Sequence, residues 1–300
     1  MRQSLPSRVA CCGAAGGKTR GLPMKVSNRL AFATAIALGV AVPASATHSW
    51  GNYHWARISN PFALRVNGAL SSKWIPHANT AMADWAKSTV LNFTSTTPFP
   101  SAASRKLCNP IAGQILVCNE LYGQRGWLGI ASIWLNGSHI TQATTKLNDT
   151  YFNMTRYNTS AWRQLVTCQE IGHDFGLAHQ DENFYNANLG TCMDYTNVPG
   201  TNQHPNQHDY DQLVKIYSHT DSFNSYKSTA TATNFGVREV GKPAAASGDR
   251  GVGDTMADWG RAIHQDGNGR PDMFVRQLPD GRTIVSHVFW APDSKGTEAG

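Results

Sequence analysis

The chain has 300 residues, of which 41% are hydrophobic and 15% charged, and its formal net charge is +6. This length allows one sizeable hydrophobic core and a small second unit, and the composition is typical of neither disordered nor fibrous proteins. Six of the 26 basic residues precede residue 47, so the remaining basic side chains equal the 20 acidic ones in number. A neutral chain lacks the basic surface that DNA, RNA and anionic lipids require, which argues against those partners.

Residues 24–46 have the features of a secretory signal peptide: a basic start, an apolar run over residues 30–42 and an Ala-Ser-Ala cleavage site. The apolar run is shorter than the roughly 20 residues that a membrane span needs. We therefore expect residues 1–46 to be removed, with residues 1–23 an over-extended start. The expected product is a secreted protein that begins at Thr47 and has no membrane anchor.

The exported part keeps four cysteines, and an even number in such a protein predicts two disulfides. Two of them flank a short segment of the loop-rich region 92–126, which favours a local disulfide that pins a hairpin. Because four cysteines allow three pairings, other partners stay open. The four residues are Cys108, Cys118, Cys168 and Cys192.

The first expected elements are a strand and an amphipathic helix. Residues 53–66 are rich in aromatic and branched side chains and predict a strand that Asn60-Pro61 interrupts. Apolar residues then recur at helical spacing, which predicts a helix that begins near Pro76 and packs on the strand. The apolar positions are Trp74, Ala78, Met82 and Trp85.

Two strands and two helices are expected to follow. Residues 129–149 predict a strand, a turn at Asn136-Gly137 and a second strand. A helix is predicted from Ser160, a suitable cap, to Gly176, where glycine favours an end. A last short helix is predicted within residues 204–219, with these side chains inward: Tyr210, Leu213, Val214 and Tyr217.

The end of the chain predicts a linker and a small module. Residues 220–250 are dominated by Ser, Thr, Ala, Gly and Lys without an apolar period, which indicates a linker. Residues 251–300 contain two alternating runs about Pro279-Asp280-Gly281 and predict a small β-hairpin module. Residues 266–272 space Asp and Asn like a calcium loop, but they lack the other ligands of an EF-hand, so a turn is predicted.

The motif with clear chemical content is "CQEIGHDFGLAHQDE", residues 168–182. Residues four apart on a helix point the same way, so Gln169 and His173 can share one metal ion, and Glu170 lies beside it. Gly176 allows the chain to leave the helix sharply and return His179 to the same place. The order is that of a hydrolytic zinc site, in which a carboxylate takes a proton from metal-bound water.

The motif resembles HExxHxxGxxH of the metzincin zinc endopeptidases, with a departure only at Gln169. Met193 in "TCMDYT" resembles the methionine of their Met-turn, which lies beneath the metal, and Tyr195 resembles a tyrosine that some members place near it. The resemblance covers about residues 50–219 and is nearest to matrixin-like bacterial proteins. It implies an α/β (α+β) catalytic domain over residues 47–219, with a twisted mixed sheet and long helices.

The resemblance also implies the cofactor and the roles of the site residues. Zn²⁺ would be bound by His173, His179 and Gln169, and Glu170 would act as the general base. An amide oxygen is a weaker zinc ligand than imidazole, so two other outcomes stay open. The site could be empty, or its shell could be completed by one of these residues: Tyr195, His204, His208 or His139.

Two further expectations depend on the resemblance. If Met193 lies beneath the metal, the two motifs come together and a disulfide between Cys168 and Cys192 would tie the ligand helix to the floor of the site. In metzincins an edge strand above the helix pairs with an extended peptide, and residues 129–135 resemble that strand. The same residues fit an ordinary core strand equally well.

The sequence thus predicts a secreted, monomeric, zinc-dependent endopeptidase with a polypeptide substrate. The alternative from another class is a catalytically inactive, secreted binding protein on the same scaffold.

Overall fold

The computed structural model describes residues 47–96, 102–226 and 249–292. The expected signal peptide and most of the expected linker lie outside these ranges. In the described part, a mixed sheet is formed by these strands: β1 (His54–Trp55), β2 (Phe62–Ala69), β3 (Leu91–Thr96), β4 (Ile115–Glu120), β5 (Trp127–Asn136), β6 (His139–Asn148), β7 (Arg261–Gln265), β8 (Pro271–Gln277) and β9 (Thr283–Trp290).

The sheet has parallel and antiparallel halves. Its order is β3-β2-β4-β6-β5-β9-β8-β7, with β1 paired to β6. Strands from β3 to β6 are parallel neighbours, and those from β6 to β7 are antiparallel neighbours. The prediction of a mixed α/β architecture is confirmed at this level.

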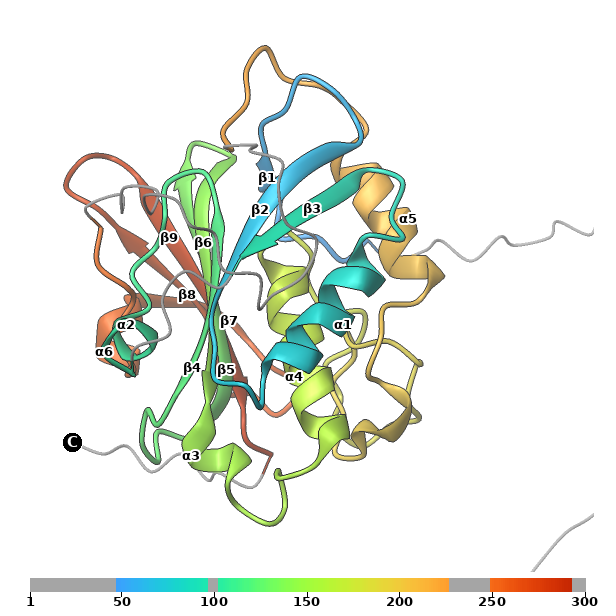
Figure 1. Ribbon diagram of the computed structural model, residues 1–300, viewed down its shortest axis with the longest axis vertical. Coiled ribbons are helices and arrows are strands. Elements are labelled where there is room, and N and C mark those ends of the chain that lie inside the picture. Colours follow the sequence, from blue (N-terminus) through green and yellow to red (C-terminus); the bar gives the residue numbers. More distant parts are fainter. Residues whose placement is uncertain (1–46, 97–101, 227–248, 293–300) are drawn as a thin grey trace, which may run out of the picture. The chain divides into compact units, whose positions relative to one another are not determined.

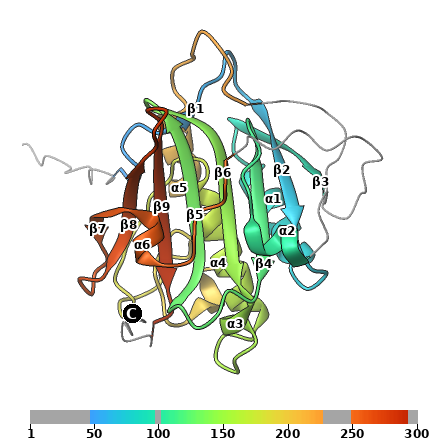
Figure 2. The same ribbon diagram turned by 90° about the vertical axis from the view of Figure 1, so that its left-hand side faces the viewer.

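Helices cover both faces of the sheet in the described residues (Figures 1 and 2). α1, α4 and α5 lie on one side, and α2 and α6 lie on the other, where α2 contacts β4 and α6 contacts β8. The helical bounds are α1 (Ile75–Trp85), α2 (Ala102–Leu107), α3 (Asp149–Phe152), α4 (Ser160–His173), the 3-10 turn Pro199–Thr201, α5 (Gln207–Ile216) and α6 (Met256–Trp259). Because both faces are covered, β5 is buried along its whole length except at Asn136.

The three longer helices start where local chemistry places them. Pro76 lies in the first turn of α1, where its missing N–H costs nothing. The Thr159 hydroxyl accepts the Trp162 N–H at 3.2 Å and caps α4. A capping box between Asn206 and Asp209 starts α5.

α4 lies between α1 and the sheet and is the central helix of the core. Its side chains from Trp162 to His173 are all buried. A helix buried on all sides keeps polar residues only where they have partners or a task. The polar side chains near its carboxyl end therefore require an explanation.

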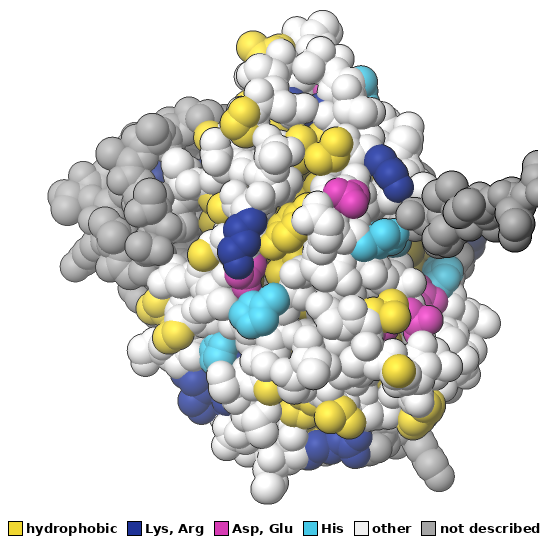
Figure 3. Space-filling model, turned by 90° about the vertical axis from the view of Figure 1, so that its right-hand side faces the viewer, with side chains coloured by type: hydrophobic (Ala, Val, Ile, Leu, Met, Phe, Trp, Pro, Cys, Tyr) yellow, Lys and Arg dark blue, Asp and Glu magenta, His cyan; other side chains and the backbone are white. Residues whose placement is uncertain are grey.

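One predicted side-chain direction is wrong. Val214 of α5 was expected to face inward, but it is 45% exposed, whereas Leu213 and Tyr217 are fully buried. Consecutive helical residues differ by about 100°, so Val214 cannot share the inward direction of Leu213. On the side of the molecule that carries α1 and α5, exposed hydrophobic side chains form a narrow strip and small groups among polar atoms (Figure 3).

Two disulfides join the four cysteines in the expected pairs, Cys108 with Cys118 and Cys168 with Cys192. The first was expected to pin a hairpin. It instead ties the residue after α2 to strand β4, because the segment before Cys108 is helical. The second connects α4 to the segment that precedes Met193.

The C-terminal strands were expected to form a module of their own. The hairpin about residues 279–281 is present and joins β8 to β9. However, β9 also pairs along its length with β5, so β7, β8 and β9 extend the central sheet. The Asp266 carboxylate accepts the N–H groups of Asn268 and Arg270, which makes residues 266–272 a turn, as predicted.

A search for membrane spans covers only the described ranges. Within them, every helix is too short or too polar to cross a bilayer.

A substitution at Gly172 tests the packing of Met193 on α4. A Cβ at Gly172 would lie 2.7 Å from Met193 Sδ and 2.7 Å from Trp85 Cζ2. We expect Gly172→Ala to lower the free energy of unfolding by about 1–3 kcal/mol through overpacking. Denaturant melts measure it, and Gly200→Ala, where a Cβ meets nothing within 4 Å, is the control. Equal stability of both variants would contradict this packing.

Candidate metal centre

Three buried histidines converge at the carboxyl end of α4. They are His173 on the helix, His179 in the following loop and His287 on β9, and one ring nitrogen of each lies within 4.8 Å of the others. His287 reaches the site because it stands opposite Ala131 in the pairing of β9 with β5. The site thus combines a local motif with a strand more than 100 residues later.

The two histidines of the motif are oriented as metal ligands. His173 Nδ1 donates to the Leu177 carbonyl at 2.8 Å, and His179 Nδ1 lies 3.2 Å from a carboxylate oxygen of Glu182. The lone pairs therefore lie on the Nε2 atoms, which are 3.0 Å apart. Tetrahedral bonds of about 2.0 Å to zinc separate two ligand nitrogens by about 3.3 Å, so the pair fits a shared cation.

His287 is oriented by a hydrogen-bonded chain. Its Nε2 lies 2.7 Å from the Tyr195 hydroxyl, and this hydroxyl donates to Asp272 at 3.3 Å. If His287 Nε2 donates to Tyr195, the lone pair is on Nδ1, which has no hydrogen-bond partner in the described residues. Nδ1 is 3.7 Å from Glu170 Oε2, so a cation near Nδ1 would also neutralise the carboxylate.

Burial keeps the three imidazoles neutral. It lowers the pKa of His173 and that of His287 well below the usual value, and the neighbouring histidines lower both further. Burial, with His264 and His48, lowers the pKa of His179 to about 3. Neutral imidazole is the form that binds metals, so the triad fits a divalent cation such as Zn²⁺.

Glu170 is a fully buried carboxylate beside this triad. No hydrogen bond of good geometry from the described residues reaches either oxygen. Burial raises the pKa of Glu170 well above its usual value, Asp174 raises it further, and the backbone amide of Ala131 opposes both. Space for the side chain exists because residue 129 is glycine: a Cβ there would lie 2.7 Å from Glu170 Oε1.

Gln169 is fully buried, and neither its amide oxygen nor its amide nitrogen has a hydrogen-bond partner in the described ranges. Leaving such a group unpaired costs about 1–3 kcal/mol. It lies four residues before His173 on α4, and ligation through its amide oxygen stays a prediction from this spacing.

Other residues considered from the sequence lie around or away from this centre. Met193 packs directly on Gly172, next to His173, because a Cβ at residue 172 would lie only 2.7 Å from Met193 Sδ. Gly176, at a φ of +91°, turns the chain after α4 towards His179. The remaining candidate ligands have other partners: His204 bonds Asp84, His208 stacks on His48, and His139 lies 3.3 Å from Asp221.

His287 is the residue that the sequence analysis missed. It lies in an alternating strand that carries no metal motif, and its role depends on the pairing of β9 with β5. The same pairing bears on the interpretation of β5. Two interpretations of this strand were open, an edge strand that pairs with a peptide and an ordinary core strand; β6 occupies one side and β9 the other, which agrees with the core strand.

Neither a scan of the chain against protein-family models nor a search of curated proteins finds a match.

Separate substitutions identify the third ligand. We expect His287→Ala to weaken zinc binding at this centre at least about 100-fold, because losing a ligand exceeds the 10–100-fold cost of losing an outer partner. Gln169→Ala should change it less than tenfold. Competition titration with a zinc chelator measures both, and His204→Ala is the control. A larger effect of Gln169→Ala than of His287→Ala would make Gln169 the ligand.

Proposed function

We propose that this chain is a secreted, zinc-dependent endopeptidase of the metzincin type, whose third zinc ligand is His287. The observation that carries the proposal is Glu170, a buried carboxylate without a well-aligned partner, adjacent to three neutral imidazoles. Burying an unpaired carboxylate is costly, so its retention is best accounted for by a chemical task. The two disulfides agree with an exported protein.

Zinc, when bound, supplies Lewis acidity that polarises a peptide carbonyl and acidifies water. The chain supplies the remaining steps. His173, His179 and His287 hold the ion, and the Tyr195–Asp272 pair keeps the His287 ring in place. Glu170 would take a proton from water as the water oxygen bonds to the carbonyl carbon, and would deliver it to the amide nitrogen as the C–N bond breaks.

Access to this centre is restricted. The side chains of His173, Glu170 and His287 are fully buried, and β9 occupies the edge of β5 to which a peptide would add. A substrate bound as an extended strand on β5 therefore requires β9 to separate first. The arrangement corresponds to a closed state of the proposed enzyme.

The closed site also favours a second candidate, an inactive zinc-binding protein on the same scaffold. In that case His287 serves as a permanent ligand, and the metal contributes to stability only. The observation that favours it is the occupied edge of β5. Glu170 has no role in this second candidate.

The substitution Glu170→Gln separates the two candidates. For the endopeptidase we expect hydrolysis of an unfolded polypeptide to fall at least about 100-fold, because the general base is lost. Zinc content should stay the same. Peptide release and bound zinc are measured on the same preparations, and Gly200→Ala is the control. Zinc-loaded wild-type protein without hydrolysis would support the inactive binding protein instead.

A further inference from the structure

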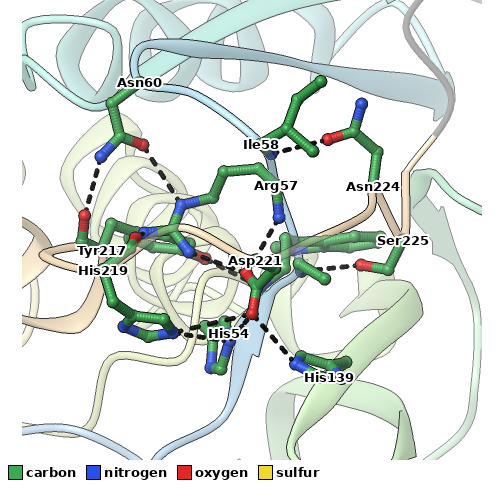
Figure 4. Close-up of polar contacts among 12 residues, drawn as sticks. His54, Arg57, Ile58, Asn60, His139, Tyr217, His219, Asp221, Asn224 and Ser225 are labelled. Atoms are coloured by element: carbon green, nitrogen blue, oxygen red, sulfur yellow. Dashed lines mark hydrogen bonds and ion pairs between the residues drawn. The ribbon is translucent and has the colours of Figure 1, made fainter.

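A second group of histidines surrounds one carboxylate, in a part of the molecule formed by other segments (Figure 4). His54 begins β1, His139 begins β6, and His219 and Asp221 lie in the loop after α5. The nitrogen atoms nearest to Asp221 Oδ1 are His139 Nε2 at 3.3 Å, His54 Nε2 at 3.5 Å and His219 Nε2 at 3.8 Å. His54 Nε2 and His219 Nε2 are 3.2 Å apart.

The separations among His54, His219 and Asp221 are close to those of ligands around one tetrahedral ion. Bonds of about 2.0 Å at tetrahedral angles separate neighbouring ligand atoms by about 3.3 Å. The rings of His139 and His219 each stand nearly perpendicular to that of His54, at 86° and 85°. His54, His219 and Asp221 therefore approach a common point from different directions, and His139 contacts the same carboxylate beside them.

The ring of His54 presents a lone pair to this point. Its Nδ1 lies 2.7 Å from the Asn52 carbonyl, which can only accept, so Nδ1 carries the hydrogen. The neutral ring then directs the lone pair of Nε2 at His219 Nε2 and at the carboxylate of Asp221. One divalent cation satisfies all of these atoms at once, whereas one proton satisfies only a single pair.

Asp221 is held so that one oxygen stays available. Its Oδ2 accepts the backbone N–H and one guanidinium N–H of Arg57, each at 3.1 Å, and Oδ1 faces the imidazoles. Arg57 is fully buried and also donates to the carbonyl of His219. Asn60 accepts from the Arg57 Nε and donates to the Tyr217 carbonyl. The ligand loop is thus fixed by hydrogen bonds to the buried Arg57 before any ion binds.

We propose that His54, His219 and Asp221 form a second zinc site, separate from the His173 centre, that joins the loop after α5 to the start of β1. Two imidazoles and a carboxylate fill three positions of a tetrahedral ion, and the fourth is open to water or, after a movement of its ring, to His139 at the start of β6. Its zinc stabilises the folded chain and leaves the reacting groups of the first centre untouched.

Zinc counting on the full-length chain tests the proposal, because the two sites have no ligand in common. The wild type should hold two zinc ions per chain after dialysis, and His219→Ala should hold one. His219 is suited to substitution because its side chain is 52% exposed. The control is His204→Ala, which removes a histidine that is 55% exposed and also contacts a carboxylate, that of Asp84. This variant should keep two ions.

A variant of the first centre makes the result independent of the endopeptidase proposal. His173→Ala with His179→Ala should keep one zinc ion, and adding His219→Ala should remove it. In the variant that lacks His173 and His179, Co²⁺ should give the intense visible absorption of a tetrahedral site, and His54→Ala should weaken it. Circular dichroism checks that each variant is folded. A variant without His173 and His179 that holds no zinc, or a His219→Ala variant that holds as much zinc as the wild type, would overturn the proposal.

Discussion

The antiparallel pairing of β9 with β5 carries His287 into the metal centre. In the register of the two strands, His287 stands opposite Ala131, and Gly129 next to it leaves room for the Glu170 carboxylate. α4 packs against the same part of the sheet and carries Glu170 and His173 on the helix that contacts β5. One pairing of strands therefore sets the metal ligands, the surroundings of the base and the occupied edge of the sheet.

Local patterns were sufficient for several elements of the fold, but not for β3, α2 and β4, which lie in or at the start of the region that was expected to be loop-rich. The spacing of Trp74, Ala78, Met82 and Trp85 predicted α1, and the turn at Asn136-Gly137 predicted the pair β5 and β6. These signals act through neighbouring residues, so they can be read without knowing the topology. The motif from Glu170 to His179 is local in the same sense, which is why two of the three histidines were identified.

The remaining features depend on contacts between distant segments. The group that includes His287 and the second histidine cluster each combine residues that are far apart in the sequence. No local spacing in the sequence marks either group. The alternating pattern of β9 predicted a strand but not its neighbour in the sheet. Because β-strand pairing is set by the whole topology, the sequence alone placed this hairpin in a separate module.

Gln169 can be understood together with β9. In the proposed centre, imidazole from His287 would supply the donor that position 169 lacks, so three histidines come together although the motif has two. The exchange has a consequence for hydrolysis, because His287 belongs to the strand that a peptide on β5 would displace. If β9 separated in the proposed enzyme, the third donor would leave with it. Gln169, whose amide oxygen has no partner in the described residues and which lies four residues before His173, would then be the candidate replacement. A weaker ligand in the open state and a stronger one in the closed state would favour closure whenever substrate is absent.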